Sequence, residues 1–345
     1  MYKVREIDKA ARAEAKRRWN SIAKPLHSLG VFEDIVTDIA GIQGTQNIDI
    51  SKRCVLVMCA DNGVVQEGVT QTTAEVTAIV TENFSKGDTS VCAMARYVGA
   101  DVIPVDVGVA RDVDGVLNKK ISYGTGNILY EKAMTYEQAK RAVQTGIDCV
   151  GNIASKGYNI IVTGEMGIGN TTTSSAVASV LLGKDAAEVT GRGAGLSNSG
   201  LERKIEVIKK AITLHKPDKN DTIDVISKVG GYDIAALAGV FIGGAVYGIP
   251  IVIDGFISAV AALCAYEMCR ESKSFMIASH VSKESCEEEI LTLLGKRAPI
   301  TADMCLGEGT GGVMLLAALD TALCVYDEMS TFEEINVEEY HEMEN

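Results

Sequence analysis

Proline, aromatic residues and histidine are scarce in this chain. Its 345 residues include 5 prolines, 1 tryptophan and 4 histidines, and aromatic residues make up 5% of the sequence. So little proline excludes a proline-rich linker, and so few aromatic rings leave the core to Val, Ile, Leu, Ala and Met. The four histidines do not pair at the spacing of metal ligands. We therefore expect no metal site.

Cysteine is present, but not in a pattern that binds zinc or forms a disulfide framework. None of the 9 cysteines forms a C-x-x-C pair, and several, such as Cys54, Cys59 and Cys264, stand in apolar runs. Buried free thiols are typical of a reducing compartment. The chain also has no signal-peptide pattern and no apolar stretch of about 18 residues. We expect a cytoplasmic protein that makes no contact with a membrane.

Positive charge is in deficit, with 33 basic against 46 acidic residues and a net charge of −13. A protein that binds nucleic acid needs a basic surface to neutralise phosphates, so we expect no nucleic-acid partner. Much of the acidity lies between Asp327 and Asn345, which holds eight acids and neither Lys nor Arg. We interpret this end as a solvated tail, with a docking segment for a basic partner as the alternative.

Short apolar runs alternate with helical patterns over most of the chain. The runs are bounded by turn residues, which is typical of strands buried on both faces. They lie at residues 54–60, 101–107, 159–163, 249–253 and 275–279, and helical patterns lie at 73–98, 135–156, 199–214, 231–247 and 256–270. This alternation predicts an α/β fold, with a mostly parallel sheet and helices on both of its faces.

The two ends of the chain break the alternation. Residues 3–29 and 31–42 have helical patterns with no strand between them, and no strand pattern follows residue 312. We therefore predict a small helical domain made of residues 1–45 and 313–345. Residues 46–312 would form the large α/β domain beside it.

The segment 164–173, GEMGIGNTTT, is the strongest sign of a binding site. It follows a predicted strand and opens a predicted helix, where glycines let a ligand approach the backbone closely. Asn170, Thr171 and Thr172 add donors beside the free N–H groups of the helix N-terminus, which favours an anion. The spacing is not that of a Walker A loop. An ordinary capped helix after a glycine turn is the alternative.

Two further glycine-rich turns add charged groups. The turn 191–196, GRGAGL, precedes a helix that carries Lys204, which can supply a cation to a phosphate or else be a solvated lysine. The turn 306–312, LGEGTGG, satisfies G-x-G-x-x-G but opens no βαβ unit, and its acid would repel a pyrophosphate, so we reject a dinucleotide site. We interpret Glu308 as a general base, with a structural turn acid as the alternative.

Polar residues also follow the predicted strands at 61–63, 254–255 and 279–280. In an open α/β sheet, ligands bind outside the carboxyl ends of the strands, so these residues predict a small-molecule site at that edge. Each of these segments is a weak signal alone, and we interpret His280 as a hydrogen-bonded structural residue.

Taken together, these segments resemble the nicotinate-nucleotide:dimethylbenzimidazole phosphoribosyltransferases of cobalamin lower-ligand assembly. The matching stretches run in family order: ADNGVV at 60–65, GEMGIGNTT at 164–172, SKVGG at 227–231, DGF at 254–256 and LGEG at 306–309. The resemblance implies a Rossmann-like sheet domain, a small helical domain from both chain ends, and a homodimer with its active site near the subunit interface. It also implies transfer of 5-phosphoribosyl from nicotinate mononucleotide to a base, most simply 5,6-dimethylbenzimidazole, without a cofactor.

The same resemblance implies a role for each matching residue. Glu308 matches the family's catalytic base, and Glu165 matches a second carboxylate of the site. The nucleotide and phosphate residues would be Gly167, Asn170, Thr171, Thr172, Lys204 and Asp254. The base pocket would contain Thr72, Val80, Met166 and Leu306.

The base pocket departs from the family pattern. Thr72 and Val80 stand where well-studied members carry serine and glutamine, which makes this pocket more apolar. Two alternatives therefore stay open. One is transfer to a phenolic base by a heterodimer with a paralogous subunit, and the other is a catalytically silent nucleotide-binding subunit.

Overall fold

A computed structural model describes residues 2–284 and 286–340 of the chain. Its main sheet has six parallel strands in the order β3-β2-β1-β4-β5-β6. The strands are β1 (Arg53–Ala60), β2 (Asp101–Gly108), β3 (Leu117–Asn118), β4 (Ile160–Met166), β5 (Ile251–Ile253) and β6 (Met276–Ala278). The strand order reverses between β1 and β4, and such a switch point is where α/β sheets bind ligands.

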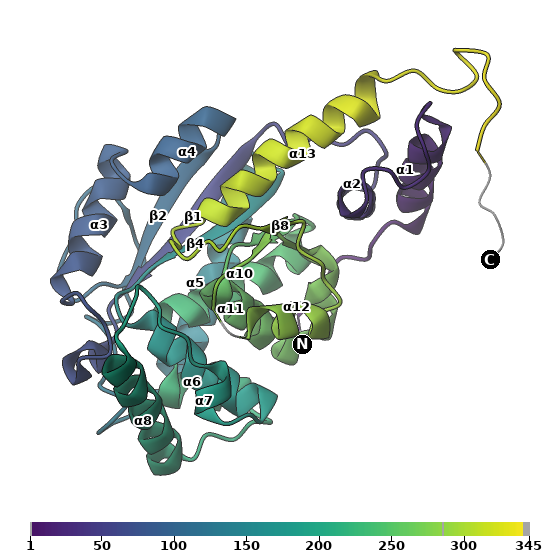
Figure 1. Ribbon diagram of the computed structural model, residues 1–345. Helices are drawn as coiled ribbons and strands as arrows, with labels where there is room; N and C mark the ends of the chain where they lie inside the picture. The colour runs from purple at the N-terminus through teal and green to yellow at the C-terminus, as the bar shows by residue number, and fades with distance from the viewer. Residues whose placement is uncertain (1, 285, 341–345) are drawn as a thin grey trace.

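Helices cover both faces of this sheet, as the sequence predicts (Figure 1). Alternate side chains of β1 point to opposite faces, so Leu56 and Met58 pack in one core while Val55 and Val57 pack in the other. The first core is built with α5 (Tyr136–Ser155), α6 (Asn170–Leu182), α7 (Ala186–Val189), α8 (Asn198–His215), α9 (Thr222–Val229), α10 (Tyr232–Tyr247), α11 (Phe256–Met268) and α12 (Glu287–Leu293). The second is built with α1 (Lys9–Ser21), α2 (Val31–Gln43), α3 (Glu75–Lys86), α4 (Ser90–Val98) and α13 (Thr310–Glu328).

The five predicted strands all form, but one predicted helix is divided. The pattern at 73–98 folds as α3 and α4, because Gly87 takes a left-handed φ of 73° and ends α3. Thr89 then starts α4 by accepting a hydrogen bond from the backbone N–H of Cys92 at 3.3 Å. The remaining short elements are the 3-10 helices η1 (Gly63–Glu67) and η2 (Arg270–Phe275) and the parallel pair β7 (His280–Val281) and β8 (Ile300–Thr301).

The first helix is shorter than the predicted 3–29. Asp8 caps α1 by accepting from the backbone N–H groups of Ala10 and Ala11 at 2.9 and 3.0 Å. The helix ends at Ser21, because Ile22 is extended and forms a β-bridge with Thr331.

The two ends of the chain lie side by side. The Trp19 ring meets the edge of Tyr326 at a centroid distance of 4.8 Å, and both pack in the core that holds β1. The division into a helical domain of residues 1–45 and 313–345 and a sheet domain of residues 46–312 stays a prediction. Beyond Glu328 the acidic tail is largely exposed up to Tyr340 apart from Phe332, and its last five residues lie outside the described part of the chain.

Within the described residues, α13 is the one helix long and apolar enough to cross a membrane by length and composition, and 56% of its apolar window is buried inside the fold. A core helix passes the same test, and α13 packs on β4, α4 and α2. All nine cysteines are free; seven are buried, as predicted, while Cys305 and Cys324 are exposed.

Candidate active site

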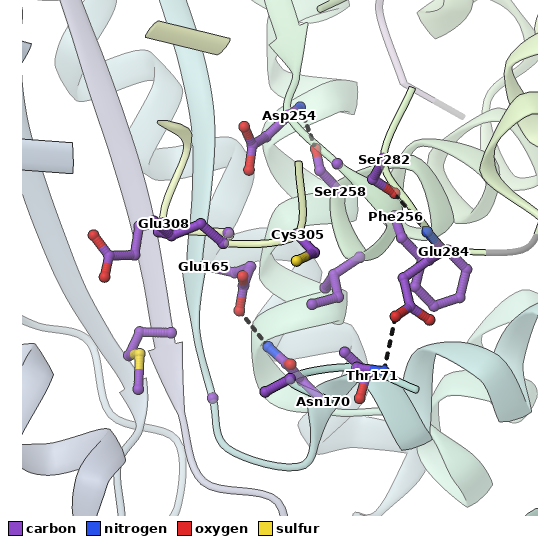
Figure 2. A pocket seen from close by; sticks show the side chains of 18 of the residues that line it. Glu165, Asn170, Thr171, Asp254, Phe256, Ser258, Ser282, Glu284, Cys305 and Glu308 are labelled. Atoms are coloured by element: carbon purple, nitrogen blue, oxygen red, sulfur yellow. Dashed lines mark hydrogen bonds between the residues drawn. The ribbon is translucent and has the colours of Figure 1, made fainter. Parts of the chain in front are cut away.

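A cavity of about 280 Å³ opens at the carboxyl ends of β4, β5 and β6, between the start of α6 and the turn before α13 (Figure 2). It lies at the edge of the sheet that the sequence predicts for a ligand. Nine of the predicted site residues line it: Val80, Glu165, Met166, Gly167, Asn170, Thr171, Asp254, Leu306 and Glu308.

Glu165, at the end of β4, lies at the floor of the cavity. The side-chain amide of Asn170 donates one hydrogen bond to Glu165 Oε2 and another to Asp233 Oδ2 at 3.0 Å. Burial, together with the nearby carboxyls of Asp233 and Asp254, raises the pKa of Glu165 to about 8 against the opposing effect of Asn170. At neutral pH, Glu165 is therefore mainly a neutral acid.

Asp233 and Asn62 continue this buried network beneath the cavity. Burial raises the pKa of Asp233 to about 6, while the Asn170 amide and the backbone N–H of Ile234 act in the opposite direction. Thr173 in turn donates its hydroxyl to Asn62 Oδ1 at 3.2 Å. Gly167 fits here because a Cβ would lie 2.6 Å from Asp233 Oδ2. The network fixes the amide of Asn170, and through it the position of Glu165.

The turn that carries Glu308 has an unusual backbone. Gly307, Glu308 and Gly309 all have positive φ, at 85°, 62° and 98°. A non-glycine residue in this region is uncommon and costs on the order of 1 kcal/mol, and such residues concentrate at functional sites.

Two buried carboxyl groups hold this turn in place. Asp254 accepts from the backbone N–H groups of Gly309 at 3.2 Å and Gly312 at 3.0 Å, which start α13. The carboxyl of Glu165 lies against the backbone N–H of Glu308. Burial raises the pKa of Asp254 to about 7 against the opposing N–H donors. Asp254 lines the cavity, yet both of its carboxyl oxygens accept hydrogen bonds from the start of α13. Its nucleotide-binding role stays a prediction.

The carboxylate of Glu308 lies at the N-terminus of α4. Its Oε2 accepts from the backbone N–H of Val91 at 3.0 Å. Burial raises the pKa of Glu308, while Val91, the Thr89 side chain and the Ser90 backbone act to lower it. Figure 2 shows the Glu308 carboxylate pointing away from Glu165. The two carboxyl groups therefore have different surroundings.

A second polar cluster surrounds Thr171 at the start of α6. Lys204 of α8 is fully buried, and its ammonium donates to Thr171 Oγ1 at 2.9 Å and to the carbonyl of Gly191 at 3.1 Å. Burial lowers the pKa of Lys204 to about 8, and the negative charge of Glu284 acts in the opposite direction. Lys204 is therefore the buried cation of this cluster.

The loop between α7 and α8 closes the cluster from the other side. The backbone N–H of Gly193 donates to Glu284 Oε1 at 2.8 Å. Arg192 is turned away, since it donates to Leu196 O and Asn198 Oδ1 at 2.9 and 2.6 Å. The loop thus offers the cluster a backbone N–H and not a second cation.

Three predicted residues do not line the cavity. Lys204 reaches its edge only through Thr171, and Thr172 is buried with no partner for its hydroxyl among the described residues. Thr72 is exposed on the loop before α3. Their assigned roles stay predictions.

The apolar side of the cavity matches the predicted base pocket in character. Val80, Met166 and Leu306 line it, together with Ile168 and Met304. Leu306 is 53% exposed, so this side opens to solvent.

Several lining or supporting residues were not predicted. Phe256 lies within the DGF stretch that the sequence singles out, whereas Ser282 and Glu284 follow the polar segment 279–280 by two and four residues. Asp233 follows the SKVGG stretch by two residues, and that proximity was its only signal.

His280 lines the cavity with its Nδ1 3.0 Å from Ser279 Oγ, and burial lowers its pKa to about 4. A neutral, hydrogen-bonded histidine agrees with the structural interpretation.

The fold and this cavity define a doubly wound α/β protein with a glycine-rich helix start, of the kind that can bind an anion, at the switch point of its sheet. The sequence model of a family described as Phosphoribosyltransferase matches residues 4–337. Proteins named nicotinate-nucleotide–dimethylbenzimidazole phosphoribosyltransferase are 46% identical over 99% of this chain and 97% of their own in Ruminiclostridium cellulolyticum, and 48% identical over 98% and 97% in Acetivibrio thermocellus.

Solved structures agree. The crystal structure of CobT from Thermus thermophilus has a TM-score of 0.89 and 34% identity, covering 95% of this chain and 99% of its own. The chain therefore belongs to the nicotinate-nucleotide–dimethylbenzimidazole phosphoribosyltransferase family, which confirms the resemblance and the α/β fold.

Proposed function

We propose that this enzyme transfers 5-phosphoribosyl from nicotinate mononucleotide to 5,6-dimethylbenzimidazole, giving nicotinate and α-ribazole 5′-phosphate for cobalamin assembly. The names of the relatives support this activity. The observation that carries it is one cavity with the Thr171–Lys204 cluster at one side and the Glu308 carboxylate at another. The cluster can bind a phosphate, and the carboxylate can accept a proton.

The phosphate would bind at the start of α6. The helix N-terminus offers free N–H groups, Thr171 offers a hydroxyl, and Lys204 offers a buried positive charge behind it. Within the described part of the chain, Lys204 donates only to two neutral oxygens and forms no ion pair. Burial of such a charge is unfavourable. A phosphate dianion would supply a partner and keep Lys204 protonated.

The chemistry then requires a base on the acceptor side. The nicotinate ring of the mononucleotide is a pyridinium, so its nitrogen leaves neutral without a general acid. Attack from the opposite face of the ribose inverts C1′ and gives the α product. The benzimidazole N–H must lose its proton, and the Glu308 carboxylate would accept it. Burial raises the pKa of Glu308, which strengthens it as a proton acceptor, and the N–H of Val91 opposes this rise by favouring the ionised form.

Glu165 would act differently in this scheme. As a neutral acid against the Glu308 backbone, it holds the turn that carries the base. Positioning both substrates and the base in one orientation supplies much of the rate enhancement. Glu165 is thus proposed as a positioning residue, with Asp254 holding the same turn from the other side.

The direct test is release of nicotinate from nicotinate mononucleotide by the purified protein, with dimethylbenzimidazole, adenine, phenol and p-cresol offered in parallel. Release with dimethylbenzimidazole supports the proposal. Release with phenols alone would favour the two-subunit alternative, and the apolar lining by Val80, Met166 and Ile168 is the observation behind that alternative. No release from folded protein with any acceptor would favour a silent subunit.

We also propose a cytoplasmic homodimer that uses no cofactor. Large apolar side chains are exposed on the adjacent helices α4 and α13, with Tyr97 88% and Met314 46% exposed. A second subunit would cover such a surface. Light scattering that gives the mass of one chain would contradict the dimer, and a two-chain mass that forms only with a paralogue would favour the heterodimer.

A further inference from the structure

Glu284 places a carboxylate where the proposed function needs an anion site. It lies between β7 and α12, and Figure 2 shows its side chain reaching toward Thr171. Its Oε1 accepts from the backbone N–H of Gly193 at 2.8 Å. Its Oε2 is buried and has no hydrogen-bond partner among the described residues. A carboxylate with one oxygen unpaired is an unfavourable occupant of a buried site.

The group that Glu284 binds belongs to the same cluster as Lys204. Gly193 has a φ of 53°, and a Cβ built on it would lie 3.0 Å from Thr171 Oγ1 and 3.7 Å from Lys204 Nζ. The Gly193 backbone therefore lies beside the Thr171 hydroxyl and the Lys204 ammonium. A phosphate that reached Thr171 and Lys204 would come within hydrogen-bond range of this N–H.

The carboxylate and a phosphate cannot both use that position. One N–H group forms one good hydrogen bond, and two anions so close in a partly buried site repel each other strongly. Among the described residues, the Glu284 carboxylate forms no hydrogen bond within its own segment, since its Oε1 accepts from Gly193 and its Oε2 has no partner. Its charge acts on Lys204 from a distance, because the ammonium donates to Thr171 and Gly191 instead.

We propose that Glu284 is a displaceable occupant of the phosphate subsite. It binds the Gly193 N–H when the site is empty, and it leaves when the phosphate of the nucleotide arrives. Glu284 thereby lowers the affinity for every ligand that carries a phosphate and leaves the affinity for the matching nucleoside unchanged. This inference rests on the proposed function, because it takes the Thr171–Lys204 cluster as the phosphate subsite.

Calorimetric titration of wild-type protein and Glu284→Gln with nicotinate mononucleotide, nicotinate riboside and inorganic phosphate tests the proposal. The glutamine keeps the shape but removes the charge, so we expect about tenfold tighter binding of the mononucleotide and of phosphate. Binding of the riboside should not change. Glu288→Gln removes the same charge from an exposed position nearby and should leave all three affinities unchanged.

Weaker or equal binding of the phosphate ligands by Glu284→Gln would overturn the proposal, because Glu284 would then only support the 191–195 loop. A structure of the wild-type complex in which Glu284 still accepts from Gly193 would overturn it as well, without relying on a variant. If wild-type protein turns over the mononucleotide and Glu284→Gln binds it no more tightly, this inference alone is refuted. Wild-type protein that binds no mononucleotide would refute the proposed function together with it.

Discussion

Glu165 and Glu308 are the same residue type at the same cavity, yet their surroundings differ. Glu165 lies in a buried network of carboxyl and amide groups, and burial raises its pKa to about 8. Glu308 is only partly buried, and the N-terminus of α4 stabilises its ionised form through Val91. These different environments support the proposed division of roles, in which Glu165 positions the base and Glu308 accepts the proton.

The largest expected effect is on Glu308. Glu308→Gln keeps an acceptor for the Val91 N–H but cannot take a proton at neutral pH. We expect kcat for nicotinate release to fall on the order of 10²- to 10⁴-fold, the usual contribution of a general base. Binding of nicotinate mononucleotide, measured by calorimetry, should stay within about twofold of wild type.

The control for this variant is Glu333→Gln, which changes an exposed acid of the tail. It should leave kcat unchanged. Wild-type turnover by Glu308→Gln would remove the base assignment.

The next effect concerns Asp254, which holds the turn of Glu308. Asp254→Ala leaves the N–H groups of Gly309 and Gly312 without their acceptor in a buried place. We expect the free energy of unfolding in urea to fall by about 2–4 kcal/mol. Asp254→Asn retains one acceptor oxygen and should lose clearly less. Equal losses for the two variants would show that charge, and not the hydrogen bonds, gives Asp254 its role.

The pH dependence of stability tests whether the pKa of Glu165 is raised in the folded protein. Its pKa is about 8 in the fold and about 4.3 when unfolded, so the folded state binds more protons between these values. Stability should therefore decline as pH rises from 5 to 8, by at most about 1.4 kcal/mol per pH unit from this group. Glu165→Gln does not titrate, and its urea denaturation should show a shallower decline. An unchanged slope would contradict the raised pKa.

The smallest effect is expected at Thr89. Its side chain acts to lower the pKa of Glu308 and also caps α4. Thr89→Ala should move the acidic limb of the kcat/KM profile to higher pH, and loss of the cap should cost about 1 kcal/mol of stability. Thr321→Ala, on the exposed face of α13, is the matched control and should leave the profile unchanged. A downward shift with Thr89→Ala would exclude Thr89 from tuning the base.

Sequence patterns predict the features that are local. The buried strands, the helix start after Gly169 and the glycines around Glu308 each follow from neighbouring residues. The split at Gly87 and the cap at Asp8 are local too, but they depend on single residues inside a longer helical pattern. The relation of Glu308 to Val91 is not local, since the two residues are 217 positions apart.

The same reason explains the site residues that the sequence did not reveal. Asp233 meets Asn170 across 63 positions, and Glu284 meets Gly193 across 91. No periodicity records such pairs, because the sheet topology brings them together. The exposure of Thr72 and the burial of Lys204 are likewise set by how α3 and α8 pack.

In the proposed mechanism, Glu165 positions the base and Glu308 is the base. The most direct test is the kcat of Glu165→Gln at neutral pH, measured as nicotinate release beside wild type and Glu308→Gln. Because glutamine resembles the neutral acid, we predict that Glu165→Gln stays within about tenfold of wild type and far above Glu308→Gln. A loss as large as that of Glu308→Gln would contradict the account, since Glu165 would then need its negative charge for the reaction.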